Sequence, residues 1–422
     1  MHRRFDRSRA NAVNPNLIPG GGPALWLDGS DASTITQTNG LISAWADKSG
    51  NGYTFAQATD ANKPYLTRSD SLENRLLQSE NLATTWTPSQ VTVVNATDLY
   101  EIAGTSEKYV TQTAEVVKGT SYTYTASAKA INGRHGIALR IRGSGFKLAY
   151  FNLQDGTAGT VTAGATSSIE PDTALGTGWY KCSITWAVDA SASAAQVIYI
   201  AGADNDTNVA GDITKGVQLT KMHFARTGKG YVTTTTYPQY AGLNGRAVPY
   251  FPGAATYMSR AFTAALDIGV GDNTIFAVVQ LDNNGADAGT NFSILDNETF
   301  QTKGGMLRFS GGASGGLPRF RTSQAGADTY VQSTTVVSGL SLVAATKSGT
   351  TGQLYRNGAI DGASATVNNA VTSSANALNL GNLAGATTGL CGYLPEVIVF
   401  NRALSSSERM WIENYLRVKW GI

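Results

Sequence analysis

The sequence of 422 residues is poor in charge, since only 15% of its residues are Asp, Glu, Lys or Arg. Typical soluble domains carry about 25%. Helices on a protein surface need charged outer faces, so this deficit predicts few exposed helices. Glycine is abundant, at 47 residues, and serine and threonine fill many segments. That mixture is typical of many short strands joined by turns.

An excess of one charge and a long apolar run are also missing. The net charge is only +2, which gives no general electrostatic reason to expect binding to nucleic acid. No apolar run approaches the roughly 18 residues that cross a bilayer, so membrane insertion is not expected. The basic N-terminus has no apolar segment behind it, so no secretory signal is expected either.

Cysteine and histidine are scarce, with 2 and 3 residues. Cys182 lies in a segment, residues 180–186, whose apolar residues alternate with polar ones. That period of two predicts a thiol on the buried face of a strand. Cys391 belongs to another part of the chain, so the two cysteines are not expected to pair. The histidines, which are too scattered for a histidine-rich metal site, are His2, His135 and His223.

The first 22 residues show no apolar periodicity and end in Pro-Gly-Gly-Gly. They are predicted to form a basic arm and linker outside any core. Two interpretations stay open: a disordered tail, or a basic peptide that becomes ordered on a partner. In the second interpretation the anchoring residues are Arg3, Arg4, Phe5, Arg7 and Arg9.

A run of strands is predicted in the middle of the chain, from about residue 76 to residue 238. Residues 121–130 place tyrosine and alanine on one face and mostly hydroxyl side chains on the other. Residues 137–142 alternate isoleucine and leucine with alanine and arginine. Short alternating strands at such intervals predict a β-sandwich or jelly roll.

The pattern changes after residue 240. Residues 274–281 and 395–400 are nearly continuous apolar runs, which predict central strands covered on both faces. Ser405 and Glu408 have the spacing of a capping box, which marks the start of a helix. The stripe that follows with helical period consists of Trp411, Tyr415 and Val418, with Ile412 and Leu416 beside it.

Motifs at the two ends of the chain resemble one family. Leu-Trp-Leu-Asp-Gly-Ser-Asp at residues 25–31 and Ala-Trp-Ala-Asp-Lys-Ser-Gly-Asn-Gly at residues 44–52 resemble the opening of a LamG-like domain. This is the concanavalin A-like lectin/glucanase sandwich of many phage and bacterial surface proteins. The other motifs of that family lie at residues 243–253, 274–280, 354–358, 392–405 and 420–422. The resemblance implies one sandwich built from two separated parts of the chain.

The middle stretch resembles a different module, a jelly roll similar to carbohydrate-binding modules and common in phage virion proteins. Its motifs lie at residues 81–86, 122–129, 149–153 and 178–183. We therefore expect an all-β fold, in which a LamG-like β-sandwich is interrupted by an inserted jelly-roll β-sandwich, with one C-terminal helix. The expected divisions are the arm at 1–22, the two LamG-like parts at 23–72 and 240–422, and the insert at 73–239.

The carboxylates that a glucanase needs are missing from the sequence pattern. Such an enzyme places two of them on either side of the glycosidic bond, and the resemblance implies an E-x-D-x-(x)-E strand. The nearest match, Glu-Pro-Asp at residues 170–172, lacks the second glutamate. The G-x-S-x-G match at residues 312–316 lacks the strand-to-helix context of a nucleophile elbow. We therefore expect no enzymatic activity.

One acidic loop is a candidate for a calcium site, and no other cofactor is expected. An EF-hand would place glycine and glutamate where this loop has Val209 and Lys215. A solvated turn is therefore the alternative to calcium binding. The candidate ligands are Asp204, Asp206 and Asp212.

Sugar binding would use exposed aromatic rings together with planar polar groups. The candidate contacts are Tyr150, Asn152, Asp296 and Asn297. Three tryptophans stand in motif or alternating positions and are predicted to belong to the core: Trp86, Trp179 and Trp186.

Together these expectations favour a structural protein of the phage virion, either a head decoration or fibre protein or a tail-associated one. Its arm would bind capsid or tail proteins, and its lectin-like domains would attach to host-surface or environmental glycans. The glycan role rests on fold analogy alone. A homo-oligomer is expected, with a trimer as the guess. Two alternatives stay open: a purely structural decoration or cement protein without a ligand, and an exported bacterial adhesin.

Overall fold

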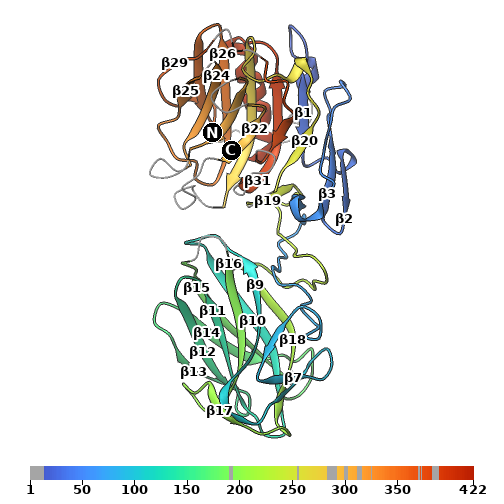
Figure 1. Cartoon of the computed structure of the whole chain (residues 1–422), viewed down its shortest axis with the longest axis vertical. Coiled ribbons are helices and arrows are strands. Elements are labelled where there is room, and N and C mark those ends of the chain that lie inside the picture. The colour runs from blue at the N-terminus through green and yellow to red at the C-terminus, as the bar shows by residue number, and fades with distance from the viewer. Residues whose placement is uncertain are drawn as a thin grey trace, which may run out of the picture. The chain divides into compact units, whose positions relative to one another are not determined.

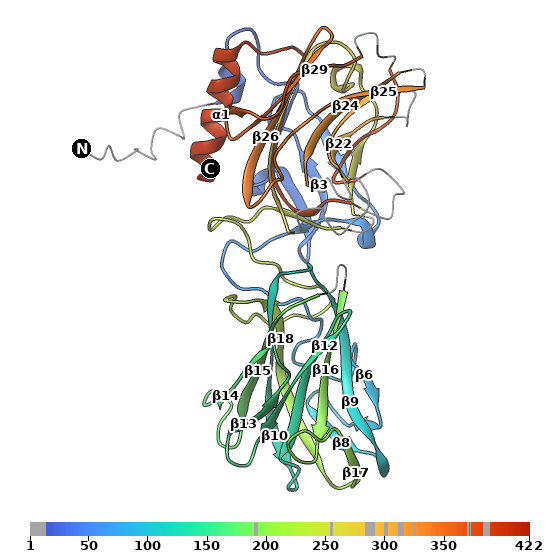
Figure 2. The same cartoon turned by 90° about the vertical axis from the view of Figure 1, so that its left-hand side faces the viewer.

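The computed structural model describes residues 14–189, 193–253, 256–282, 292–298, 303–310, 316–324, 326–368, 371, 373–382 and 389–422. Within these residues the fold consists of β-strands, a few 3-10 turns and one α-helix (Figures 1 and 2). This confirms the all-β expectation. The chain divides into two compact units. We call residues up to Ser69 together with Gly242–Ile422 the split unit, and Asp70–Ala241 the inserted unit. The divisions expected at residues 72 and 239 lie within a few residues of these.

The split unit is a sandwich of two antiparallel sheets. One sheet runs β31–β21–β26–β27. On the other edge of β31, β19 and β1 pair with successive stretches of that strand, and β28 and β29 lie beside β27. The other sheet runs β2–β3–β4–β20–β30–β22–β23–β24–β25, and β5 pairs with both β3 and β19. The strands before the insertion are β1 (Leu25–Asp28), β2 (Ile35–Thr38), β3 (Leu41–Ala46), β4 (Thr54–Ala56) and β5 (Tyr65–Leu66).

The strands after the insertion are more numerous. They are β19 (Pro249–Pro252), β20 (Met258–Arg260), β21 (Asn273–Leu281), β22 (Phe292–Asp296), β23 (Gly305–Phe309), β24 (Pro318–Gln324), β25 (Ala327–Gln332), β26 (Leu340–Ser348), β27 (Thr351–Arg356), β28 (Ala359–Ile360), β29 (Ala365–Thr366), β30 (Leu378–Leu380) and β31 (Cys391–Phe400). The 3-10 turns of this unit are Pro15–Leu17, Ala32–Thr34, Asp60–Asn62 and Ala264–Leu266.

The central strands of the first sheet are covered on both faces. In β31, Val397 and Val399 belong to the core between the sheets. The intervening Glu396 and Ile398 point to the opposite face, as the alternation of a strand requires, yet they are buried too. The α-helix α1 (Ser406–Trp420) covers this second face (Figure 2). The apolar runs at residues 274–281 and 395–400 are thus confirmed as central strands.

Helix α1 begins with the expected capping box. The hydroxyl of Ser405 accepts from the backbone N–H of Glu408, whose carboxylate accepts from the backbone N–H of Ser405 at 2.8 Å. At its other end Gly421 has a left-handed φ of 72°, a conformation that glycine adopts without strain. No helix in the described part of the chain is both long and apolar enough to span a membrane.

The predicted apolar stripe of this helix was wrong in part. Trp411 is only half-buried, and Val418 is 40% exposed. The face that packs on the sheet is turned by about one residue, because Tyr415 and Trp420 both bind the buried Glu396. The apolar side chains on that face are Ile412, Tyr415, Leu416 and Trp420.

The inserted unit is also a two-sheet antiparallel sandwich. One sheet has the order β14–β15–β10–β18–β8–β7, and the other has the order β13–β12–β11–β16–β9–β17 with β6 beside β9. The strands are β6 (Thr87–Ser89), β7 (Val91–Val93), β8 (Asp98–Glu101), β9 (Gly104–Glu115), β10 (Ser121–Ile131), β11 (Gly136–Arg142), β12 (Phe146–Asn152), β13 (Thr157–Val161), β14 (Thr166–Pro171), β15 (Tyr180–Ala187), β16 (Ser193–Ala201), β17 (Asn208–Gly211) and β18 (Gly216–Arg226).

The side chains of the alternating segments of the insert lie on the predicted faces. Tyr122 and Tyr124 of β10 are fully buried in the core of this unit. Cys182 is also buried there, and burial raises the pKa of its thiol. Cys182 and Cys391, both among the described residues, form no disulfide. Two of the predicted core tryptophans, Trp86 and Trp186, are buried. The prediction was wrong for a third, which lies half-exposed in the turn before β15: Trp179.

A buried carboxylate joins the two ends of the inserted unit. Glu73 is fully buried and pairs with Arg75 at 2.8 Å and with Arg226 at 3.1 Å. Its backbone carbonyl binds the Nε2 of His223 at 2.7 Å, and its carboxylate accepts from the backbone N–H of Ala241. The segment that opens the unit is therefore fastened to the segments that close it. Burial acts to raise the pKa of Glu73, but the two arginines outweigh it and lower this pKa to about 2.

The sign of this shift predicts acid sensitivity. The folded pKa of Glu73 lies below its ordinary value of 4.5, so its contribution is present above that value and is lost as the pH falls toward about 2. The contribution is on the order of 3 kcal/mol. Calorimetry of the full chain from about pH 7 to about pH 3 should show one unfolding transition whose midpoint temperature falls steeply in acid. In Glu73→Gln the midpoint temperature should be lower at neutral pH and should vary less with pH. Equal acid sensitivity in both proteins would refute the assignment.

Candidate functional site

Two hollows in the described residues are lined by polar side chains. One, of about 1030 Å³, lies in the split unit beside the C-terminal end of α1. The other, of about 520 Å³, lies in the inserted unit at one end of the sheet that contains β11, β12 and β13. We call the side chains beneath the first hollow the Glu396 cluster, and the second hollow the Tyr150 pocket.

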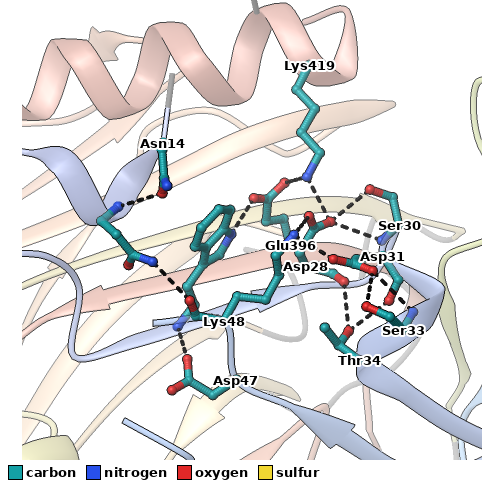
Figure 3. Close-up of polar contacts among 12 residues, drawn as sticks. Asn14, Asp28, Ser30, Asp31, Ser33, Thr34, Asp47, Lys48, Glu396 and Lys419 are labelled. Atoms are coloured by element: carbon teal, nitrogen blue, oxygen red, sulfur yellow. Dashed lines mark hydrogen bonds and ion pairs between the residues drawn. The ribbon is translucent and has the colours of Figure 1, made fainter. Parts of the chain in front are cut away.

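The Glu396 cluster is built on two strands that the insertion separates in sequence. Asp28 of β1 and Glu396 of β31 are direct neighbours in the antiparallel register. Glu396 is fully buried, and its carboxylate accepts four hydrogen bonds, of which the one from Lys419 is drawn in Figure 3. The donors are Trp26 Nε1 at 2.8 Å, Tyr415 Oη at 2.9 Å, Lys419 Nζ at 2.7 Å and Trp420 Nε1 at 2.7 Å.

Two lysines connect the acids of this cluster. Lys419 also lies 2.7 Å from Asp28, and Lys48 lies 2.9 Å from Asp28 and 2.7 Å from Asp31 (Figure 3). Burial acts to raise the pKa of Asp28, but Lys419 and Lys48 hold it below its ordinary value. The hydrogen bond from Lys48 lowers the pKa of Asp31 to about 2. Burial raises the pKa of Glu396, and the surrounding donors oppose that rise.

The geometry of the cluster suits the joining of β1, β31 and α1 better than it suits proton transfer. A glycosidase presents two carboxylates to a substrate, one of them as a proton donor. Here Lys419 lies between Asp28 and Glu396, and indole and phenol donors occupy the oxygens of Glu396. The motifs in the sequence did not predict this carboxylate pair, because its members lie in distant segments. A glutamate inside the apolar run 395–400 was the available signal, since a buried charge needs partners.

The Tyr150 pocket is formed where strand ends of the insert meet. Tyr150 and Asn152 end β12, Gly136 begins β11, and Thr157 and Gly159 come from β13. Asp204, in the loop after β16, lines the pocket together with Arg134, His135 and Gln154. Sugar sites combine an apolar wall with a few converging polar groups, and pockets of about 300–1,000 Å³ hold small ligands.

Two glycines that line this pocket stand where their neighbours leave no room for a side chain. A Cβ atom on Gly159 would lie 2.2 Å from the carboxylate of Asp204 and 3.3 Å from the Cβ of Tyr150. Any larger residue would therefore displace the aspartate or the tyrosine. A Cβ on Gly136 would lie 2.4 Å from the carbonyl oxygen of Ala201. Glycine at position 136 therefore lets β11 pass close to its partner strand β16.

The polar groups around the pocket are held by local bonds. Asn152 donates to Asp155 at 3.2 Å and accepts from the backbone N–H of Gln154 at 2.9 Å. Asp204 accepts from the backbone and hydroxyl of Thr160 at 2.6 and 2.8 Å. The Nδ1 atom of His135 is buried and has no hydrogen-bond partner among the described residues. Burial raises the pKa of Tyr150, so its hydroxyl stays protonated at neutral pH.

The structure brings two of the four sugar-contact candidates together. Tyr150 and Asn152 line one pocket, and Asp204, expected as a calcium ligand, lies beside them. The other two candidates lie inside the split unit: Asp296 is 0% and Asn297 is 1% exposed. Asp296 accepts from Ser293 Oγ at 2.7 Å, and Asn297 donates to Asp267 at 2.6 Å. Because both side chains are buried and bonded, neither is placed to touch a sugar.

The acidic loop does not gather its carboxylates into a metal site. Asp206 accepts from the backbone N–H of Asn208, and Asp212 accepts from the backbone N–H of Thr214. Each carboxylate thus caps its own turn. Within the described ranges, no group of three or more His, Cys, Asp or Glu side chains could hold a metal ion. The solvated-turn interpretation fits these contacts. The proposed anchor residues Arg3, Arg4, Phe5, Arg7 and Arg9 lie outside the described residues.

Part of the split unit matches a family model. Residues 252–408 match the family model of the concanavalin A-like lectin/glucanases superfamily. The expected LamG-like resemblance is confirmed over this stretch. The segment before the insertion lies outside the match, but it belongs to the same sandwich because β1 pairs with β31 from Leu25↔Val399 to Asp28↔Glu396. No curated protein matches this sequence.

Solved structures give weaker likenesses. The binding domain of botulinum neurotoxin DC in complex with rat synaptotagmin II is 9% identical, with 42% of this chain and 41% of that chain covered and a TM-score of 0.31. The Ruminococcus gnavus IT-sialidase CBM40 bound to alpha2,3 sialyllactose is 14% identical, with 39% and 95% covered and a TM-score of 0.31. The chain thus spans about two fifths of the length of the first. Likenesses at this level transfer no function.

The contacts of Glu396 predict a large effect from removing its charge. Glu396→Gln leaves one carbonyl oxygen facing several donors and places an amide among them, so about 3–5 kcal/mol of unfolding free energy should be lost. Urea unfolding followed by tryptophan fluorescence suits the measurement, because Trp26 and Trp420 contact the mutated group. The control is Glu170→Gln, which removes an exposed pair with Lys181 and should cost less than about 1 kcal/mol. Equal effects would contradict the fastening role.

Proposed function

We propose that this is a non-catalytic glycan-binding protein whose sugar site is the Tyr150 pocket. The observation that carries the proposal is the convergence on one hollow of a tyrosine side chain that is 6% exposed, an amide, a carboxylate and several glycines. Carbohydrate sites use this combination, because rings cover the apolar faces of sugars and planar polar groups bind their hydroxyls. The lectin-family match of residues 252–408 supports the same class of function.

The absence of catalysis is part of the proposal. Two neighbouring carboxylates, Asp28 and Glu396, do meet in the split unit, but both bind Lys419. In the Tyr150 pocket the one carboxylate that lines the wall, Asp204, is engaged by Thr160. Among the described residues these contacts leave neither hollow with a free acid and base on either side of a substrate. Release of reducing sugar from any bound polysaccharide by the purified protein would overturn this part.

We further propose that the protein is carried on a phage particle, as a head decoration, fibre or tail-associated protein. The sequence motifs that resemble modules of phage surface proteins support this, as does the basic segment at the N-terminus. Two sandwiches with no disulfide among the described cysteines suit folding in a reducing cytoplasm before release. A structural decoration protein without a ligand and an exported adhesin are the alternatives.

The proposed glycan site predicts that binding depends on the ring of Tyr150. The wild-type chain should bind a subset of a glycan array, and Tyr150→Ala should weaken the best ligand about tenfold or more, because ring contact and pocket shape are both lost. Tyr150→Phe, which keeps the ring, should retain most of the affinity. Tyr330→Ala, which removes an exposed tyrosine of the split unit, is the matched control and should bind as the wild type does. Thermal melts check that each variant is folded.

The outcomes separate the candidate functions. Glycan binding that ignores Tyr150 would move the site elsewhere, and no binding at all would favour a structural role. Deletion of residues 1–22 should abolish incorporation into particles while glycan binding persists. Incorporation that survives this deletion would refute the anchoring role of the arm.

A further inference from the structure

The sheet that forms the Tyr150 pocket carries arginines on its outer face, beside side chains that are largely buried. Along β11 the side chains alternate: Ile137, Leu139 and Ile141 enter the core of the insert, whereas Ala138, Arg140 and Arg142 point to the opposite face. On that opposite face Tyr150 of β12 and Tyr199 of β16 both neighbour Ala138 in the register. We call this surface the Arg140 face.

The residues of this face form rows across four strands. The first row holds Tyr150, Ala138, Tyr199 and Tyr109, and the next row holds Leu148, Arg140, Val197 and Thr111. The ring centroids of Tyr109 and Tyr199 are 5.3 Å apart. Since a strand advances about 3.4 Å per residue, Arg140 lies about 7 Å from the row that contains Tyr150. That separation is on the scale of a single sugar residue.

Arg140 is oriented by rings and has no acid partner. Its guanidinium carbon lies 4.8 Å from the ring centre of Tyr199 and 5.8 Å from that of Phe146. Its Nε atom is buried and has no hydrogen-bond partner in the described part of the chain. No described carboxylate forms an ion pair with Arg140 or Arg142. The acid of the adjoining turn, Asp189, is bound by the backbone N–H groups of Ser144 and Gly145.

A second orphan polar group lies in the same place. Tyr199 is fully buried, yet its hydroxyl has no hydrogen-bond partner among the described residues. Buried polar groups without partners are uncommon and costly in proteins. Burial raises the pKa of Tyr199 to about 12, so at neutral pH it is a neutral donor beside the guanidinium. The two groups offer donors to the same kind of acceptor.

The charges along this surface have opposite signs at its two ends. Asp204 lines the Tyr150 pocket, and Asp204, Asp206 and Glu107 all act electrostatically on Tyr150. The arginines lie at the other end, on the rows beyond Tyr150. A neutral glycan would leave the guanidinium of Arg140 without a counter-charge. A carboxylate or sulfate would supply that charge and accept charge-assisted hydrogen bonds from the guanidinium.

We propose that the Arg140 face binds the acidic group of a glycan, a sugar carboxylate or sulfate, while the neighbouring sugar ring occupies the Tyr150 pocket. This inference rests on the proposed glycan-binding function and names the ligand class of the same site. The alternative, in which Arg140 only packs on Tyr199 and Phe146, predicts no preference for acidic glycans.

The experiment compares matched acidic and neutral probes on the full chain. One pair is polygalacturonate and its carboxyl-reduced derivative, and the other is dextran sulfate and dextran. One acidic member should bind at least about tenfold more tightly than its neutral partner, since a hydrogen bond to a charged group contributes about that factor. Added salt should reduce this preference.

The variants connect that preference to Arg140. Arg140→Gln should remove the preference, and Arg140→Lys should keep part of it. The matched control is Arg319→Gln, because Arg319 stacks on Tyr330 in the split unit at 4.1 Å. Arg142→Gln, an exposed change, should weaken the preference even if Arg140→Gln fails to fold.

The outcomes separate the acidic-group inference from the glycan-binding function. Equal binding of acidic and neutral members overturns the acidic-group inference and leaves the glycan-binding function standing. A preference that survives both arginine substitutions also overturns the inference. Binding of neither member of any pair or of any array glycan overturns the glycan-binding function itself.

Discussion

A single buried carboxylate holds together the parts of the split unit that the insertion keeps apart in sequence. Glu396 accepts from Trp26 in the first strand and from Tyr415, Lys419 and Trp420 in the helix. An ion in a low-dielectric interior is costly unless donors surround it. Because those donors come from β1 and α1, only the closed sandwich supplies them all. The requirement to neutralise this one charge therefore links strand pairing, helix docking and the position of the hollow above them.

The inserted unit uses the same device on a smaller scale. Glu73, near the start of the insert, is neutralised by Arg75 and by Arg226 from its last strand. Each unit thus has an internal fastening of its own that closes its chain ends. The sugar site is separate from both fastenings, in strand-end and loop residues such as Asn152 and Asp204. A binding loop can vary there without loss of the charge pairs on which the fold depends.

Local patterns predicted a large share of this structure. The alternation around Tyr122, the capping box at Ser405 and the burial of Cys182 depend on neighbouring residues, and each is as the sequence indicated. Tyr150, one of the candidate sugar contacts, lines the pocket. The phase of the α1 stripe was missed, because a partner on β31 decides which face of the helix is buried.

The remaining errors also concern distant contacts. Asp296 and Asn297 look like an exposed polar loop in sequence, but Ser293 and Asp267 satisfy them in the interior. Glu396 looked like an interruption in an apolar run, and its partners lie as far as 370 residues away. Alternation alone places Arg140 on the outer face. Its lack of an acid partner depends on where the carboxylates of all the other segments lie. Register between far strands carries this information, and no single segment contains it.

The pairing of β1 with β31 has a consequence for the order of events during synthesis. The first strand of the split unit leaves the ribosome long before the strand against which it must zip, and the whole inserted unit is made in between. The insert, complete by Ala241, can therefore fold first, as domains do when they emerge in turn. Until β31 arrives, the segment from β1 to β5 waits with its apolar side chains unprotected. That wait lasts as long as the synthesis of the insert and of the strands that follow it, because the ribosome adds only about 5–20 residues per second.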